Sequence, residues 1–166
     1  MIALHDFNHL PEKEALALLT PCVALPGWAE ALVCGRPYPS RSELTIAAQA
    51  LMQRWDEASL AQALSAHPRI GEKPAGEEVE AALSRQEQGA VNDRDAALAQ
   101  ALREGNARYE ARFGRVFLIR AKGRSGEEIL QALHARLENS DAQEIRAALE
   151  QLREITLLRL EGVIHE

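Results

Sequence analysis

The sequence predicts an all-α fold, a single domain over residues 1–166 built as a bundle of about seven to ten helices. Ala, Leu, Glu, Arg and Gln dominate the composition, and these residues lose little side-chain freedom in a helix. Hydrophobic residues make up 46% of the chain but aromatic residues only 4%, so Leu and Ala must form most of the core. Val and Ile are sparse, and no run alternates as a half-buried strand would.

Prolines and glycines mark the ends of the helices expected in the first part of the chain. Pro11 is a favourable first-turn residue, and Thr20-Pro21 ends the helix that it begins. Gly35 closes the next helix. Ser40 begins a capping-box pattern, because a glutamate follows it three residues later. The expected helices are 11–20, 26–33, 40–55 and 57–65.

Similar signals divide the second part of the chain. Asn92-Asp93 can cap a helix that Gly114 ends, and the apolar run 115–120 is the most strand-like segment, expected to be extended. Ser125 and Ser140 each begin a further capping-box pattern. The expected helices are 77–89, 94–113, 125–139 and 140–164.

Charge and composition exclude several classes of protein. The formal net charge of −6, with Lys and Arg scattered along the helices, argues against a nucleic-acid binder, which needs a basic face. Nothing approaches the roughly 20 consecutive apolar residues of a membrane span. The N-terminus lacks the pattern of a secretory signal. Cys22 and Cys34 are expected to be free thiols in a reducing compartment.

The stretch Ala66-His67-Pro68-Arg69-Ile70-Gly71 offers a histidine from a rigid, non-helical corner. The proline pushes His67 out of the α region and cannot continue the preceding helix, and Gly71 permits a turn. Histidine is also the side chain whose unperturbed pKa, about 6.5, suits proton transfer near neutrality. The same pattern also fits a helix-ending His-Pro without any catalytic role.

Ser84 and Glu87 are three residues apart, so they share a face of the helix expected there. A hydroxyl and a carboxylate side by side can bind a polar ligand and handle protons. The alternative is a solvated helix surface in an acidic protein. The pair becomes a candidate site only if its face is directed toward His67.

The last helix carries an arginine on its apolar stripe. Arg159 lies four residues after Ile155 and four before Val163, on the stripe that also contains Ile145, Leu149 and Leu152. A core-facing guanidinium is costly unless it is paired or hydrogen-bonded. Either a structural carboxylate or an anionic ligand gripped by the planar guanidinium would meet that need.

Two further features concern the backbone and metals. The apolar residues Phe117, Leu118 and Ile119 belong to the core, yet an extended segment leaves its backbone N–H and C=O groups able to pair with a ligand. His5 and His9 have the i, i+4 spacing of zinc ligands on a helix, but no third ligand is near in sequence, so no metal site is expected.

Several short motifs follow one another in order along nearly the whole chain. They are Phe7-Asn8, Trp28-Ala29, Arg36-Pro37, His67-Pro68-Arg69-Ile70-Gly71, Ser84-x-x-Glu87-Gln88-x-Gly89, Asn106 to Tyr109, Phe113-Gly114, Phe117-Leu118-Ile119, Ala121 to Ser125 and Arg159-Leu160. In residues and spacing this series resembles the family of 2-oxo-4-hydroxy-4-carboxy-5-ureidoimidazoline (OHCU) decarboxylases, the last enzymes of the route from urate to allantoin.

The resemblance implies a cofactor-free carboxy-lyase, usually a homodimer, that converts OHCU to (S)-allantoin and CO2. It implies that His67 and Glu87 are catalytic, and either can be the group that protonates the product carbon. The substrate-binding residues that it implies are Pro68, Ser84, Phe117, Leu118, Ile119 and Arg159. The chain ends without the peroxisomal Ser-Lys-Leu signal, so the bacterial cytoplasmic form of the enzyme is expected.

Two other functions fit parts of the same pattern. A helical module that kept the fold but binds a partner protein would not need His67, Ser84, Glu87 and Arg159 together. A hydrolase acting on the related hydroxyisourate would share the substrate class but release no CO2. Release of CO2 together with formation of a single allantoin enantiomer distinguishes the decarboxylase from both.

Overall fold

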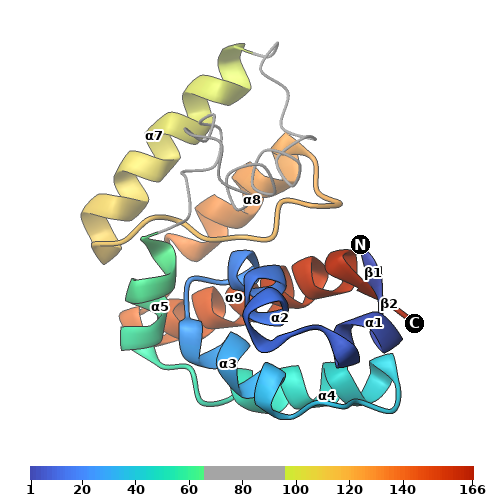
Figure 1. The fold of residues 1–166 in the computed structure, drawn as a ribbon. Helices are drawn as coiled ribbons and strands as arrows, with labels where there is room; N and C mark the ends of the chain where they lie inside the picture. Colours follow the sequence, from blue (N-terminus) through green and yellow to red (C-terminus); the bar gives the residue numbers. More distant parts are fainter. Residues whose placement is uncertain (66–95) are drawn as a thin grey trace. The chain divides into compact units, whose positions relative to one another are not determined.

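The computed structural model describes residues 1–65 and 96–166, and the described residues are predominantly helical, which confirms the all-α prediction (Figure 1). The chain divides into two compact units. Unit 1 contains Met1–Ala63 and Arg153–Glu166, and unit 2 contains Leu64–Leu152. The single domain expected over residues 1–166 stays a prediction.

The described residues contain eight α-helices, one short 3-10 helix and two strands of two residues each. Their order is β1 (Ile2–Ala3), α1 (Leu4–His9), α2 (Glu12–Leu19), η1 (Thr20–Cys22), α3 (Pro26–Cys34), α4 (Arg41–Met52), α5 (Glu57–Leu64), α7 (Ala96–Phe113), α8 (Gly126–Arg136), α9 (Asp141–Val163) and β2 (Ile164–His165). The helix expected at 77–89 and the cap expected at Asn92-Asp93 lie outside the described residues.

The ends predicted at Ser125, Ser140 and Gly114 form as the sequence indicates, whereas at Ser40 only the serine half of the predicted capping box is present. The Ser125 hydroxyl accepts a hydrogen bond from the Glu128 N–H, and the Glu128 carboxylate accepts one from the Ser125 N–H, which completes a capping box for α8. Ser140 and Gln143 make the same reciprocal pair before α9. Gly114 ends α7 with a φ of 71°, a conformation that few other residues adopt.

Helix α4 ends three residues before the position predicted from the sequence. Ser40 caps it by accepting from the Glu43 N–H. Beyond Met52, the Arg54 N–H donates to the Leu51 carbonyl and the Trp55 N–H to the Met52 carbonyl, both three residues back. These i to i−3 bonds tighten the last turn and end the regular helix.

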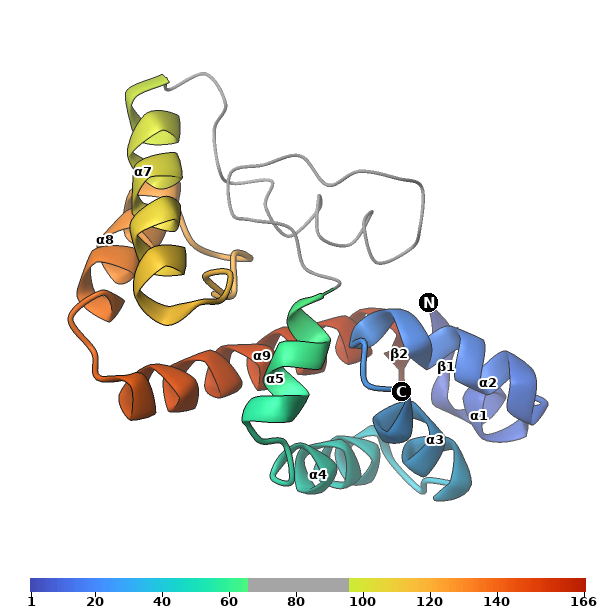
Figure 2. The ribbon, with the colours of Figure 1, turned by 90° about the vertical axis from the view of Figure 1, so that its left-hand side faces the viewer.

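The parallel pair β1 and β2 was not predicted. Ile2 pairs with Ile164 and Ala3 with His165, which brings the two ends of the chain side by side (Figures 1 and 2). Two residues cannot show an alternating pattern, so the sequence carries no signal for this pair. It joins the start of unit 1 to the end of α9.

Two of the sequence motifs tie α1 to the loop after α3 in unit 1. The Arg36 guanidinium donates from Nη1 to the carbonyls of Phe7 (2.7 Å) and Leu10 (2.8 Å), which lie at the end of α1. Asn8 donates to the Tyr38 carbonyl and accepts from the Tyr38 N–H, both at 2.9 Å. The Arg36 bonds supply donors to carbonyls at the end of α1, where the helix itself provides few, and the Asn8 bonds hold the backbone of Tyr38.

Helices α7 and α8 lie side by side in unit 2 and enclose a core that includes the segment after Gly114 (Figure 2). Tyr109 packs against Phe113 and, edge-on, against Phe117, with ring centroids 4.8 and 5.2 Å apart. The other members of this cluster are Leu98, Leu102, Ile119, Ala121, Ile129, Leu133 and Leu137. Phe117 and Ile119 are therefore core residues, as predicted.

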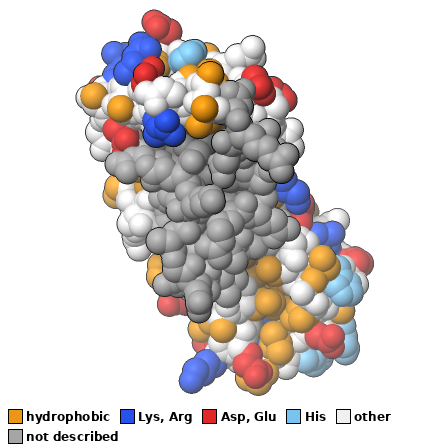
Figure 3. Space-filling view, turned by 90° about the horizontal axis from the view of Figure 1, so that it is seen from above, with side chains coloured by type: hydrophobic (Ala, Val, Ile, Leu, Met, Phe, Trp, Pro, Cys, Tyr) orange, Lys and Arg blue, Asp and Glu red, His pale blue; other side chains and the backbone are white. Residues whose placement is uncertain are grey.

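The surface agrees with the charge distribution read from the sequence. On the face shown in Figure 3, acidic and basic side chains of the described residues are interspersed. None of the described helices is both long enough and apolar enough to cross a membrane.

The close approach of α7 and α8 gives a first testable prediction. A Cβ added at Gly105 would lie 2.4 Å from Cδ2 of Leu133, a fully buried side chain with little room to move. We expect Gly105→Ala to lower the free energy of unfolding by about 1–3 kcal/mol, measured by urea denaturation.

Gly162→Ala is the matched control, because a Cβ there meets nothing within 4 Å and the residue lies in the last turn of α9. It should leave stability unchanged or raise it by up to about 1 kcal/mol. Equal losses in the two variants would contradict the close packing of α7 on α8.

Candidate active site

The predicted site residues fall into three groups in the structure. His67, Pro68, Ser84 and Glu87 lie outside the described residues. Arg159 belongs to unit 1, whereas Phe117, Leu118 and Ile119 belong to unit 2. Each described part of the site is therefore built within its own unit.

Arg159 is buried, as the periodicity of the last helix predicts. Its residue exposure is 3%, and the neighbouring Ile155 and Leu160 are buried with it. The stripe is nevertheless offset from the predicted one at its edges. Ile145 and Val163 are only half-buried, whereas Glu144 and Ala148 are fully buried.

The Arg159 guanidinium is directed toward the backbone of η1. Its Nη1 lies 3.5 Å from the Pro21 carbonyl oxygen and 3.4 Å from that of Cys22, both long hydrogen bonds. These contacts join the end of α9 to η1 within unit 1 and orient the side chain. A buried guanidinium held in this way can bind a carboxylate or a carbonyl with a fixed geometry.

The segment that contains Phe117, Leu118 and Ile119 follows the α7 terminus without forming a helix or a strand. All three residues are buried, with exposures of 1%, 4% and 4%. The Leu118 carbonyl accepts a hydrogen bond from Arg136 Nη1 at 2.5 Å. Among residues 1–65 and 96–166, the N–H groups of Leu118 and Ile119 find no acceptor. Buried N–H groups require partners, so this backbone can serve a ligand.

A buried polar network that the sequence analysis missed lies behind this segment. Glu144 is fully buried, and its Oε1 accepts from the Tyr109 hydroxyl and from Nε and Nη2 of Arg136. Its Oε2 accepts from Asn139 Nδ2 at 3.0 Å. Arg136 also lies over the Phe117 ring, 4.6 Å from the centroid. We call Tyr109, Arg136, Asn139 and Glu144 the Glu144 network.

One feature of the sequence, the position of Glu144, could have indicated a buried polar network. Glu144 lies four residues before Ala148 and eight before Leu152, on the buried face of α9. A carboxylate on that face requires cationic or hydrogen-bonding partners. The sequence contains many arginines, however, and it does not indicate that Arg136 is the partner.

The network shifts the ionisation of its tyrosine. Burial is the main cause that raises the pKa of Tyr109, and its hydrogen bond to the Glu144 carboxylate raises it further. Burial likewise raises the pKa of Tyr38 in unit 1. Both phenols therefore stay protonated in the folded protein at a pH where a free tyrosine ionises.

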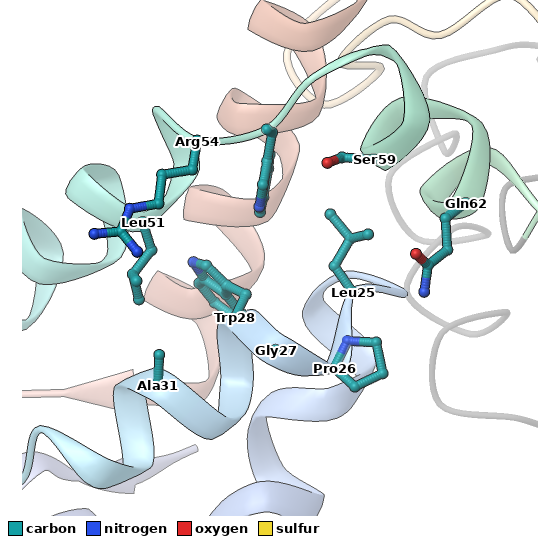
Figure 4. Close-up of a pocket in the computed structure, with 10 residues that line it drawn as sticks. Leu25, Pro26, Gly27, Trp28, Ala31, Leu51, Arg54, Ser59 and Gln62 are labelled. Atoms are coloured by element: carbon teal, nitrogen blue, oxygen red, sulfur yellow. The ribbon is translucent and has the colours of Figure 1, made fainter.

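Unit 1 also contains a pocket of about 380 Å³ that the sequence analysis did not predict (Figure 4). Both tryptophans of the chain line it, and the Trp28 indole N–H donates to the Ala48 carbonyl at 3.3 Å. Arg54 contributes a guanidinium at its edge. Of the predicted site residues that the structure describes, Phe117, Leu118, Ile119 and Arg159, none lines this pocket. The described residues that line it are Leu25, Pro26, Gly27, Trp28, Ala31, Leu51, Arg54, Trp55, Ser59 and Gln62.

The histidine pair near the N-terminus is explained by local contacts. His9 Nδ1 lies 2.7 Å from the His5 carbonyl oxygen, and the two rings are 4.5 Å apart. The part of the chain that the structure describes holds no group of three His, Cys, Asp or Glu residues able to bind a metal ion. The expectation of a cofactor-free site stays a prediction.

Comparison with protein families gives a match over almost the whole chain. The model of the family described as OHCU decarboxylase matches residues 8–161. This range contains every residue predicted for the site, both within and outside the described part of the chain.

Similar proteins and a solved structure agree with that match. The OHCU decarboxylase of Amia calva is 32% identical over 87% of this chain and 81% of its own length. That of Haloferax volcanii is 28% identical over 81% of this chain and 79% of its own. A crystal structure of an OHCU decarboxylase in the presence of (S)-allantoin has a TM-score of 0.72 and 25% identity, covering 92% of this chain and 97% of the other.

The raised tyrosine pKa values give a second testable prediction. The unfolded chain releases the Tyr109 proton near the ordinary pKa of about 10, and the folded chain only at higher pH. Above a pH of about 10 the unfolded state therefore binds fewer protons than the folded state. The stability conferred by neutral Tyr109 is then lost as the pH rises. A spectrophotometric titration of the folded protein should show tyrosinate formation displaced to higher pH than in the unfolded protein, and Tyr109→Phe should halve the final signal. Titration of both phenols near pH 10 in the folded protein would contradict the buried network.

Proposed function

The chain belongs to the OHCU decarboxylase family, and we propose that it converts 2-oxo-4-hydroxy-4-carboxy-5-ureidoimidazoline to (S)-allantoin and CO2. This reaction is the last step from urate to allantoin in purine catabolism, and the enzyme is a carboxy-lyase. The family match over residues 8–161 carries the proposal. The relatives of similar length carry the same activity in their names.

The reaction explains why the site needs these types of residue. The substrate carries its carboxylate on a ring carbon next to a carbonyl and an imine-like nitrogen. Loss of CO2 leaves an electron pair that the ring can delocalise, so the chemistry requires no external electron sink. The protein must orient the anion, stabilise the charge that develops on the ring, and deliver a proton to one face of it.

Arg159 is assigned to the orientation of the substrate. Its guanidinium can hold substrate oxygens in a bidentate fashion, and its burial strengthens that interaction by excluding water. The contacts with the carbonyls of Pro21 and Cys22 support this role, because they fix the side chain before substrate binds.

The backbone near Ile119 is assigned, together with Ser84, to the ring and ureido groups of the substrate. The ureido group has both N–H and C=O groups, so backbone amides can form hydrogen bonds with it. The same preorganised hydrogen bonds can stabilise the charge that develops on the substrate ring. The buried N–H groups of Leu118 and Ile119, without acceptors among the described residues, support this assignment. Pro68 and the backbone groups of Phe117 and Leu118 would complete the lining of the pocket.

His67 and Glu87 are assigned to acid–base work. The imidazole acts on the substrate hydroxyl or donates the proton, with the carboxylate as its partner.

We further propose that the enzyme works without a cofactor and as a cytoplasmic homodimer, as the family resemblance implies. Light scattering on the purified protein tests the dimer.

The central experiment supplies freshly generated substrate and follows two products. We expect stoichiometric CO2 release and optically active (S)-allantoin. The substrate decays spontaneously to racemic allantoin, so optical activity is the more specific signal. A hydroxyisourate hydrolase or a protein-binding module would give neither signal above the uncatalysed background, and that result would overturn the proposal.

The acid–base assignment predicts the behaviour of two variants. His67→Asn and Glu87→Ala should each lower turnover by about 100-fold or more, because general acid–base catalysis contributes that much. Far-UV circular dichroism should not change. Near-normal turnover in both variants would refute the assigned roles.

The binding assignment predicts a different pattern for Arg159. Arg159→Ala should raise KM and also lower kcat, since it removes an interaction made in both the ground state and the transition state. Arg159→Lys keeps the charge but not the planar fork, so it should recover only part of the loss. An effect confined to thermal stability, with normal kinetics, would make Arg159 a purely structural residue.

A further inference from the structure

One hydrogen bond of the Glu144 network reaches the backbone of the candidate site. Two nitrogens of Arg136, Nε and Nη2, are held by Glu144 Oε1. The third, Nη1, donates to the Leu118 carbonyl at 2.5 Å. The guanidinium thus connects a fully buried carboxylate to one peptide group of the candidate site.

That peptide group also contains the N–H of Ile119. A peptide unit is planar, and the described backbone has its one cis bond at Arg36-Pro37, so the Leu118–Ile119 unit is trans. In a trans unit the N–H points opposite to the C=O. By holding the Leu118 carbonyl, Arg136 therefore fixes the direction of the Ile119 N–H.

A second side chain fixes the peptide group on the other side of Ile119. The Arg120 N–H donates to Gln151 Oε1 at 2.9 Å. That N–H shares its trans peptide unit with the Ile119 carbonyl, so Gln151 fixes the direction of this carbonyl. Both hydrogen-bonding groups of Ile119 are thus set by side chains distant in sequence.

The same bonds strengthen the groups that they orient. A carbonyl that accepts from a charged donor polarises its peptide unit, and the N–H of that unit becomes a better donor. In residues 1–65 and 96–166, the Ile119 N–H has no acceptor. A buried, polarised and fixed N–H is suited to an oxygen of a bound ligand.

We propose that Arg136, held by Glu144, and Gln151 are positioning residues that aim the backbone N–H and C=O of Ile119 at the ureido or ring amide groups of the substrate. This inference rests on the proposed function, which places the Ile119 backbone at the substrate. In this proposal both side chains act through the backbone of Ile119 and not by contact with the substrate. A shift of about 1 Å in such a group costs on the order of 100-fold in rate.

The first test changes Gln151. Gln151→Leu removes the acceptor for the Arg120 N–H, and we expect kcat/KM to fall by about tenfold to 100-fold. Gln151→Glu keeps an acceptor oxygen at the same place and should restore most of the activity. Equal losses in the Leu and Glu variants, or normal activity in Gln151→Leu, would overturn the role of Gln151.

The second test removes the Arg136 contact without leaving a buried charge unpaired. Arg136→Met alone would strand the Glu144 carboxylate, so the variant used is the double substitution Arg136→Met with Glu144→Leu. Replacement of both members of a buried pair by apolar residues is often neutral for stability. We expect the double variant to fold and to lose about 100-fold in kcat/KM.

Leu133→Ala is the control for lost stability, because Leu133 belongs to the same core cluster but makes neither of the two bonds. It should lower the unfolding midpoint and leave kcat/KM of the folded fraction near the wild-type value. If it lowers kcat/KM as much as the double variant, the positioning role is refuted.

A spectroscopic measurement separates positioning from general stability. With isoleucine labelled by 15N, and the Ile119 signal identified by its absence in Ile119→Val, (S)-allantoin is added to the folded protein. The Ile119 amide proton should shift on binding in the wild type, and the shift should be lost or reduced in Gln151→Leu and in the double variant. An unchanged shift in both variants would overturn the proposal.

The outcomes also distinguish this proposal from the function on which it rests. A wild-type protein that releases no CO2 from fresh substrate would refute the decarboxylase function itself. An active wild type, with both positioning variants as active as the wild type, would refute the positioning role and leave the decarboxylase function standing.

Discussion

The burial of one carboxylate constrains most of unit 2. Glu144 is fully buried, and a charge in that setting must be paired and hydrogen-bonded. Its partners come from three places, Tyr109 on α7, Arg136 on α8 and Asn139 just before α9. The position of each helix against the others must therefore satisfy this one group. Arg136 extends the same constraint to the segment after Gly114.

A buried ion pair of this kind contributes little net stability. The cost of removing two charges from water roughly cancels their attraction, and apolar residues of similar size often replace such a pair without loss. The Glu144 network is better explained by the arrangement of the helices that it specifies. A core of Leu and Ala alone tolerates small displacements, whereas four directional hydrogen bonds permit one arrangement of the helices.

The local features of the fold could be predicted from the sequence, and the long-range ones could not. Caps at Ser125 and Ser140 depend on residues three apart, so they are visible in the sequence. The burial of Arg159 follows from helical periodicity. The pairing of Ile2 with Ile164 involves too few residues to leave a pattern. The choice of Arg136 as the partner of Glu144 depends on how α8 packs, which no local pattern encodes.

In the candidate site, too, local features could be predicted from the sequence and long-range contacts could not. Residue types and spacing predicted the site residues through family resemblance, and glycines flanking residues 115–120 indicated backbone outside a helix. The hydrogen bonds that orient this backbone come from side chains 18 and 31 residues away in sequence, so they emerge only from the packed structure.

A main-chain group that binds through its amide has no side chain of its own to mutate. The orientation of the Leu118–Ile119 peptide depends instead on Arg136, which lies 18 residues after Leu118 in the sequence. An alanine scan across this region would register a packing defect at Ile119 and leave its amide intact. Because the geometry of this peptide depends on the Arg136 guanidinium, the substitutions that disturb it are expected in α8 and not in the segment itself.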